Sequence, residues 1–165
     1  MGELIKWFQL NYPELKEALI QCNHHFNEAS LNPYHIEDDC WSHTMMVCKV
    51  AQIKNFDRAV QVAALLHDIA KPFTKTINSK KRLVYFSGHE EKSAQIAKPI
   101  LEKMQKAKFI NTEQIADIIE IIKLHGRIYK DKKSVLEELK NRPKVLQYLL
   151  ELNTCDEMGR FFITN

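Results

Sequence analysis

The sequence predicts an all-α protein, a single helical bundle of roughly six to eight helices. Three observations favour this class: apolar side chains recur at helical spacing, helix start signals precede those runs, and the 165 residues include only 4 Gly and 5 Pro. The length is that of one ordinary domain, and no linker or internal repeat divides the chain. We therefore expect residues 1–165 to form one domain.

Two helices are expected in the N-terminal third. The first begins at Pro13, a favoured first helical position, and its predicted buried face carries Leu15, Leu19, Cys22 and Phe26. The second should run from about Asp39 to Val50.

The centre of the chain combines the most apolar helix with the one segment that has strand character. Asp57 precedes an apolar run from Ala59 to Ala70, which should end near Pro72 because proline disfavours helical geometry at the preceding residue. Around residues 74–86 two short β-favouring stretches flank a polar turn, which predicts a hairpin-like excursion from the bundle.

Capping patterns divide the second half into helices. A helix through about Ala107 should start at Ser87, because Glu90 completes a capping box with it. The same pattern recurs at Asn111 with Gln114 and at Ser134 with Glu137. Pro143 should begin the last long helix.

Composition indicates the cellular compartment of the protein but does not identify a binding partner. The net charge of +3 is mild and the Lys and Arg residues are scattered, so composition alone does not require a polyanionic partner. The four cysteines form no CxxC pair, which favours free thiols in a reducing compartment. No apolar run approaches the ~20 residues of a membrane span. We expect a soluble, cytoplasmic protein without membrane attachment, either a monomer or a homodimer.

Five polar side chains occupy positions where helical periodicity predicts core residues: His43, His67, Asp68, His125 and Asp156. An ionised carboxylate in such a position loses several kcal/mol of hydration unless a cation or strong donors compensate. A divalent metal supplies that compensation, and imidazole with carboxylate is a ligand set suited to Mn, Fe, Co, Ni or Zn.

The simpler alternative is that each histidine is a hydrogen-bonded core residue. A lone His on an apolar face is more often that than a metal ligand. The adjacent pair His67 and Asp68 is harder to explain in this way, because two costly polar groups interrupt an Ala/Leu/Ile-rich helix. A joint role for the set is therefore the better hypothesis.

These residues also resemble a known family. His43, the run from Ala64 to Pro72 (ALLHDIAKP) and the distant Asp156 resemble the H…HD…D signature of the HD superfamily of metal-dependent phosphohydrolases. The segments FSGHE at residues 86–90 and IIKLH at 121–125 resemble the HD domains of bacterial tRNA nucleotidyltransferases and of RNA end-healing enzymes fused to a polynucleotide kinase. The run from His35 to Thr44 is similar to the end-healing subgroup, except that Asp38 stands where those relatives usually carry glycine.

The resemblance implies an HD-type helical bundle with a specific ligand set. One metal would be held by His43, His67, Asp68 and Asp156, and a second by Asp68, His89 and His125. One or two divalent transition metal ions are therefore expected, with Mg as a further candidate.

Basic residues near these ligands are candidates for binding phosphate. Lys71 lies three residues after Asp68, and Arg160 lies four residues after Asp156 on the same predicted helix face. With Asp68 they form the candidate catalytic set, and Lys71, Arg160, Lys75 and Arg127 form the candidate substrate-binding set.

The resemblance implies hydrolysis of phosphate esters on nucleotides or RNA 3′ ends, as a 2′,3′-cyclic phosphodiesterase or a 2′- or 3′-phosphatase. A separate kinase or ligase is a candidate partner. Two alternatives stay open: a (deoxy)nucleotidase or nucleoside triphosphate hydrolase with the same metal chemistry, and a non-catalytic nucleotide-binding module.

Overall fold

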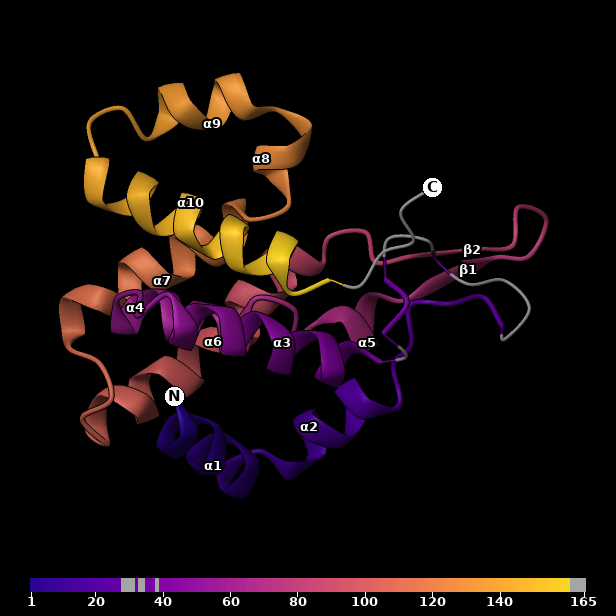
Figure 1. Cartoon of the computed structure of the whole chain (residues 1–165), viewed down its shortest axis with the longest axis horizontal. Coiled ribbons are helices and arrows are strands. Elements are labelled where there is room, and N and C mark those ends of the chain that lie inside the picture. The colour runs from indigo at the N-terminus through magenta and orange to yellow at the C-terminus, as the bar shows by residue number, and fades with distance from the viewer. Residues whose placement is uncertain (28–31, 33–34, 38, 161–165) are drawn as a thin grey trace.

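The computed structural model describes residues 1–27, 32, 35–37 and 39–160 as a helical bundle with one small sheet (Figure 1). The all-α prediction is confirmed, although the described residues form ten helices because several are only one or two turns long. The elements are α1 Gly2–Asn11, α2 Pro13–Ile20, α3 Cys40–Ile53, α4 Arg58–Leu66, α5 Lys71–Thr74, β1 Thr76–Asn78, β2 Leu83–Tyr85, α6 His89–Lys106, α7 Thr112–Leu124, α8 Arg127–Lys130, α9 Lys132–Glu138 and α10 Pro143–Met158.

Helix α4 is the centre of the bundle. It contacts α3, α6, α7 and α10, and its residues from Val62 to Leu66 are all buried. The Asp57 carboxylate accepts a hydrogen bond from the Ala59 amide at 2.8 Å and so begins the helix. Because the stretch from Val62 to Leu66 is apolar and buried on every side, α4 is stable only when other helices surround it.

The predicted helix from Ala59 to Ala70 is shorter in the structure. Helix α4 ends at Leu66, and the next turns tighten, with the Ile69 and Lys71 amides donating to carbonyls three residues back. Pro72 therefore does not end the helix but lies in the first turn of α5. The tightened segment directs two consecutive side chains, His67 and Asp68, into the interior.

The expected helix through Phe26 is also wrong in its C-terminal half. Helix α2 ends at Ile20, and the Cys22 carbonyl accepts a hydrogen bond from the Cys40 amide at 2.8 Å. This bond joins the start and the end of the connection between α2 and α3, where a longer α2 would separate them. Upstream, α1 packs Phe8 into the core, parallel to the Trp41 ring.

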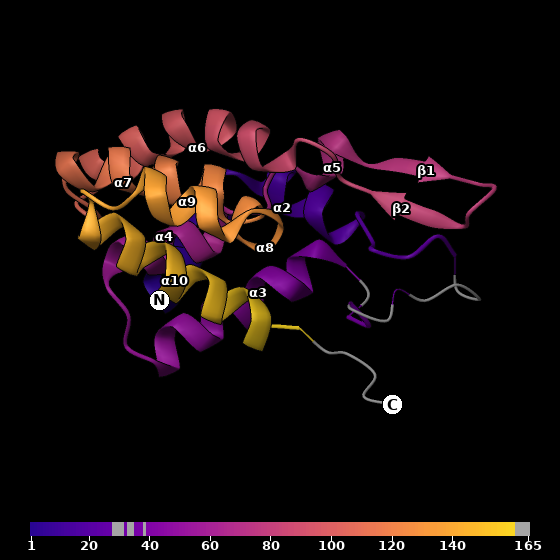
Figure 2. The same ribbon diagram turned by 90° about the horizontal axis from the view of Figure 1, so that it is seen from above.

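The hairpin predicted around residues 74–86 is confirmed. Strands β1 and β2 pair antiparallel, with Thr76 opposite Tyr85 and Asn78 opposite Leu83. Figure 2 shows this two-stranded ribbon extending away from the helices, beyond α5.

The capping predictions had different outcomes. Asn111 and Gln114 form the expected capping box of α7, and α10 begins at Pro143 as predicted. Ser87 does not cap α6, because Gly88 takes the N-cap position with φ +77° and begins the helix one residue later than predicted. Ser134 does not begin α9 either: its amide donates to the Asp131 carboxylate, which is the true cap.

All four cysteines are free thiols, as predicted, and all four are buried. Burial raises the pKa of the Cys155 thiol to about 12, which suits a small apolar core residue rather than a nucleophile. Among the described helices, none has both the length and the apolar character that a membrane crossing requires.

Candidate metal centre

Three helices bring the first group of potential ligands together. His43 lies on α3, His67 follows the end of α4, and Asp156 lies near the end of α10. The His43 Nε2 atom is 3.0 Å from Asp156 Oδ1, and His67 Nε2 is 3.9 Å from the same oxygen. All three side chains are buried, so residues that are 113 positions apart in the chain meet in a protected site.

The second group lies directly beside the first and shares Asp68 with it. Asp68 Oδ1 is 3.2 Å from His89 Nε2 and 3.6 Å from His125 Nε2. Its other oxygen, Oδ2, is 3.2 Å from His67 Nε2 and 3.7 Å from His43 Nε2. One carboxylate therefore directs an oxygen to each group, which is the arrangement that a ligand shared by two cations requires.

The four histidines are oriented alike. Each directs Nε2 inward, while Nδ1 faces an acceptor: the carbonyls of Ala64, Phe86 and Ile122 for His67, His89 and His125, and the Glu37 carboxylate for His43. Hydrogen bonds to the three carbonyls place the proton of His67, His89 and His125 on Nδ1, and the Glu37 carboxylate 3.1 Å away favours the same position in His43, so the inward Nε2 atoms carry lone pairs. Ligand histidines are held in this way, and it is the tautomer that metal coordination needs.

Two inward atoms have no hydrogen-bond partner among the described residues. His67 Nε2 and Asp68 Oδ1 are both fully enclosed yet make no hydrogen bond of acceptable geometry. A buried unsatisfied polar atom costs about 1 to 3 kcal/mol, and two together would be expensive in a core so well packed elsewhere. A divalent cation between the inward atoms would satisfy both, so the residues fit a metal of the N/O-binding class.

Electrostatics agrees with a site built for positive charge. Burial works against ionisation of Asp68 and Asp156, but neighbouring imidazoles, together with Lys71 for Asp68 and Arg160 for Asp156, hold the pKa of each carboxyl well below its usual range. Burial lowers the pKa of His67, so this ring is a neutral donor of a lone pair. Both carboxylates are therefore ionised at neutral pH beside the neutral His67 ring, as metal binding demands. Although burial opposes it, contacts with Asp156 and Glu37 raise the pKa of His43, and contacts with Asp68 raise the pKa of His125, so a cation would have to displace any proton on these two rings.

A cavity of about 530 Å³ opens above the two groups and is lined by Asp68, His89, His125 and Asp156. Lys71 and Arg160 also line it, and they pair with Asp68 and Asp156 respectively. The other predicted phosphate-binding residues lie outside this lining. Lys75 donates to Asn23 at 2.8 Å, and Arg127 pairs with Glu138 at 2.8 Å.

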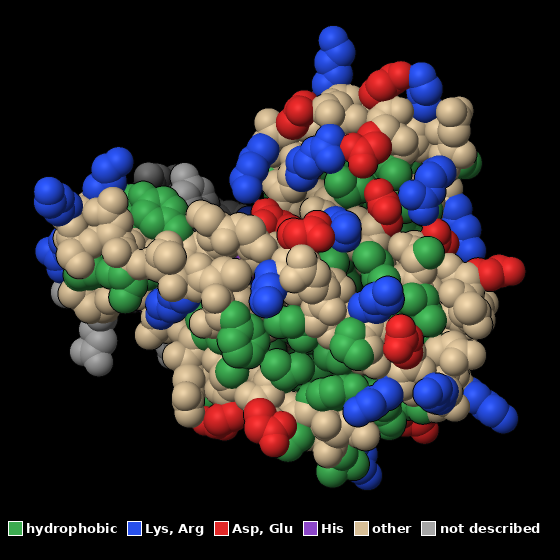
Figure 3. Space-filling model, turned by 180° about the vertical axis from the view of Figure 1, so that it is seen from behind, with side chains coloured by type: hydrophobic (Ala, Val, Ile, Leu, Met, Phe, Trp, Pro, Cys, Tyr) green, Lys and Arg blue, Asp and Glu red, His purple; other side chains and the backbone are tan. Residues whose placement is uncertain are grey.

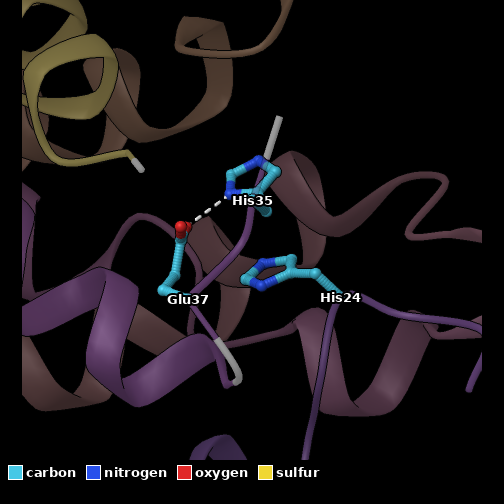
Figure 4. A group of neighbouring side chains, drawn as sticks. All are labelled: His24, His35 and Glu37. Atoms are coloured by element: carbon cyan, nitrogen blue, oxygen red, sulfur yellow. Dashed lines mark hydrogen bonds and ion pairs between the residues drawn. The ribbon is translucent and has the colours of Figure 1, made fainter. Parts of the chain in front are cut away.

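Three functional candidates were not anticipated: Glu37, His35 and His24 (Figure 4). His24 is 2% exposed, and its ring stacks on that of His35 with centroids 4.3 Å apart. No helical periodicity marks these residues, since they lie between α2 and α3, and Asp38 beside them is outside the described residues. Only the local density of His and acidic residues from 24 to 39 indicated them.

This third cluster is better explained as support for His43 than as another metal site. His35 Nδ1 donates to Glu37 Oε1 at 2.7 Å, and His43 Nδ1 is 3.1 Å from the same oxygen. These two contacts already compensate the Glu37 charge, and although burial opposes it they hold the pKa of Glu37 below its usual range. The Lys71 ammonium lies 3.1 Å from His24 Nε2 and donates to it, so the lone pair of this nitrogen is already occupied.

Replacing Glu37 with Gln is therefore expected to weaken divalent metal binding about 10- to 100-fold, the usual cost of losing an outer carboxylate. The neutral amide no longer favours the His43 tautomer that exposes Nε2. Competition against a fluorescent chelator measures the affinity. Glu91→Gln, at an exposed carboxylate on α6, is the matched control, and equal affinities for both variants would contradict this role of Glu37.

The comparisons with known proteins agree with this geometry. A family model described as "HD domain" matches residues 40–157, which is most of the chain and includes every inward ligand. The chain belongs to the HD-domain family. This membership makes it part of a superfamily of metal-dependent hydrolases, and the two groups of inward side chains in this HD domain are clusters that could bind the metal.

Curated relatives of this HD domain include several bacterial proteins named "Multifunctional CCA protein". The one from Methylobacillus flagellatus is 26% identical over 89% of this chain, and the one from Dechloromonas aromatica is 28% identical over 77%. The chain spans 32% and 31% of the length of these two relatives. No solved structure matches the chain.

Proposed function

We propose that this HD domain is a metal-dependent phosphohydrolase that cleaves phosphate esters of nucleotides or RNA ends. The observation that carries the proposal is the position of Asp68 at the floor of the cavity, with one oxygen toward each group of histidines. Groups that could each hold a cation, beside two basic side chains, suit a phosphoryl group, which carries negative charge on several oxygens.

A bound divalent metal lowers the pKa of a coordinated water toward about 7 and polarises phosphoryl oxygens, so it supplies both a nucleophile and charge neutralisation. The chain's own residues complete the site. Lys71 lines the cavity beside Asp68, and Arg160 lines it beside Asp156. Both side chains bind non-bridging phosphate oxygens. The Tyr129 hydroxyl donates to Asp156 Oδ2 at 3.1 Å and fixes the orientation of that carboxylate.

Two observations support 2′,3′-cyclic phosphates, 2′-phosphates or 3′-phosphates of RNA ends as substrates. The first is the similarity of the segment from His35 to Thr44 to RNA end-healing HD enzymes, since His35 and His43 of this segment lie at the site. The second is that relatives over most of the chain are named multifunctional CCA proteins. A separate kinase or ligase remains a candidate partner under this proposal.

A nucleotidase or nucleoside triphosphate hydrolase is the second candidate function. The cavity of about 530 Å³ favours it, because this volume lies within the range of small-molecule sites. A non-catalytic nucleotide-binding module is less well supported, since all six predicted ligand positions converge and two inward atoms make no hydrogen bond to any residue that the structure describes.

A substrate panel tests the proposal. Metal-stripped protein should be supplied separately with Mn, Fe, Co, Ni, Zn and Mg, and assayed on 2′,3′-cyclic, 2′- and 3′-phosphate nucleotides beside a set of dNTPs. We expect turnover of the terminal phosphate esters with at least one metal and none after chelation. Turnover of dNTPs alone would favour the second candidate, and tight metal binding without turnover would favour the non-catalytic module.

A further inference from the structure

The hairpin formed by β1 and β2 has an unusual charge for its position. From residue 69 to residue 89 the sequence contains no Asp or Glu, but it contains five cations: Lys71, Lys75, Lys80, Lys81 and Arg82. Three of them, at 80–82, form the turn of the hairpin and are exposed. Figure 3 shows the projecting arm with Lys and Arg side chains at its tip and no acidic side chain on that face.

The hairpin is not built to be buried. Both faces of the ribbon are largely open, with Ile77 57% exposed on β1 and Tyr85 40% exposed on β2. A two-stranded ribbon is marginally stable by itself, so apolar and aromatic side chains left open on one are costly unless something covers them. Cations interspersed with exposed aromatic and aliphatic side chains are typical of surfaces that bind single-stranded nucleic acid.

Strand β2 leads from this cationic tip directly to the metal centre. Val84, Tyr85 and Phe86 line the same cavity as Asp68 and His125. At about 3.3 Å per residue, Arg82 and Phe86 are separated by roughly 13 Å. A ligand held at the tip can therefore extend along β2 into the cavity, where the Lys71 ammonium lies 5.3 Å from the centre of the Phe86 ring.

We propose that the hairpin binds the backbone of a single-stranded RNA whose 3′-terminal phosphate ester occupies the cavity. This inference rests on the proposed function and narrows its substrate from nucleotides in general to the end of a strand. Lys80, Lys81 and Arg82 pair with backbone phosphates, Tyr85 offers a surface on which a base stacks, and the terminal ester reaches the two groups of metal ligands. A free mononucleotide fills the cavity but does not reach the tip.

The test compares a strand with a mononucleotide. An oligoribonucleotide of about ten residues, within the usual size of single-strand sites, should carry the same terminal 2′,3′-cyclic phosphate as a cyclic mononucleotide. In the K80Q/K81Q/R82Q variant we expect kcat/KM for the oligonucleotide to fall about tenfold at low salt, since three phosphate contacts are lost. The value for the mononucleotide should stay within about twofold of wild type, because these side chains do not line the cavity.

The matched control is K132Q/K133Q/K140Q, which removes three exposed positive charges from α9 and the turn that follows it, away from the hairpin in both ribbon views. It should leave both values unchanged if position matters rather than net charge. If the two triple variants change kcat/KM for the oligonucleotide equally, or if neither changes it, the inference is overturned. The hairpin would then bind a different partner, such as an acidic protein surface.

A binding measurement separates this inference from the proposed function. In the Asp68→Asn background, fluorescence anisotropy should show oligonucleotide affinity falling with salt. The plot of log affinity against log salt has a negative slope, and its magnitude should be smaller by about 2 in the hairpin variant, because each phosphate contact on a single strand contributes about 0.7. Hairpin-dependent binding in this background, with no hydrolysis of any ester by the metal-loaded protein that retains Asp68, would refute the proposed function alone. Hydrolysis with hairpin-independent binding would refute the strand-binding inference alone.

Discussion

Replacing Asp68 with Asn should lower kcat/KM for the hydrolysed phosphoester at least about 10³-fold, a loss of about 4 kcal/mol in transition-state stabilisation. Asp68 is the side chain with an oxygen toward both histidine groups. An amide has one weakly coordinating oxygen and an NH₂ group, so it cannot supply an anionic ligand to both. Steady-state kinetics at saturating metal, with metal content measured on the same sample, checks the result.

The control for this variant is again Glu91→Gln, which neutralises a carboxylate on α6 outside the cavity and should keep full activity. Asp68→Asn also removes the partner of the buried Lys71 ammonium, 2.7 Å away, so folding must be verified by circular dichroism. If it does not fold, His89→Ala serves instead, because that side chain is partly exposed and its loss disturbs the core less. Undiminished turnover in a folded variant at either position would refute the mechanism.

Metal loading should raise the thermal unfolding midpoint by on the order of 10 °C. At a free metal concentration about 1,000 times Kd, a ligand that binds only the folded state stabilises it by about 4 kcal/mol, and each kcal/mol shifts the midpoint of a domain this size by about 2 to 4 °C. The structural reason is that loading satisfies the enclosed His67 Nε2 and Asp68 Oδ1 atoms at no cost in packing. Calorimetry of chelator-treated and reloaded protein measures the shift.

Two variants make this stability prediction specific. Asp156→Asn removes an anionic ligand of the first group and should abolish most of the shift, whereas the Glu91→Gln control should retain it. If no metal tested raises the midpoint of the wild-type protein above that of the chelator-treated sample, the two groups do not hold a cation.

Local sequence patterns predicted much of this fold. Helices α2, α7 and α10 begin where the capping and proline signals place them, and the hairpin lies where β-favouring residues flank a polar turn. These features depend on interactions within a few residues, so a single sequence contains enough information to find them. The wrong caps at Ser87 and Ser134 differ from the true ones by one to three positions, because Gly88 adopts the left-handed conformation at the start of α6 and the Asp131 carboxylate accepts from the Ser134 amide.

The inner ligands were predictable for a related reason. A His or Asp at a core position of an apolar helix is costly, so His43, His67, Asp68, His125 and Asp156 were visible as anomalies, and the resemblance to the HD superfamily added His89. The structure brings all six together, and their role as metal ligands remains a prediction.

What the sequence by itself determined, therefore, is the helical class, the hairpin and the identity of the inward polar residues, because each depends on short-range periodicity or on one side chain's cost of burial. Only the tertiary structure decided the division of those residues into two groups around Asp68, the support of His43 by Glu37, and the exclusion of Arg127 from the cavity. Each of these depends on distances between helices and loops far apart in the chain, which packing sets and no local pattern records.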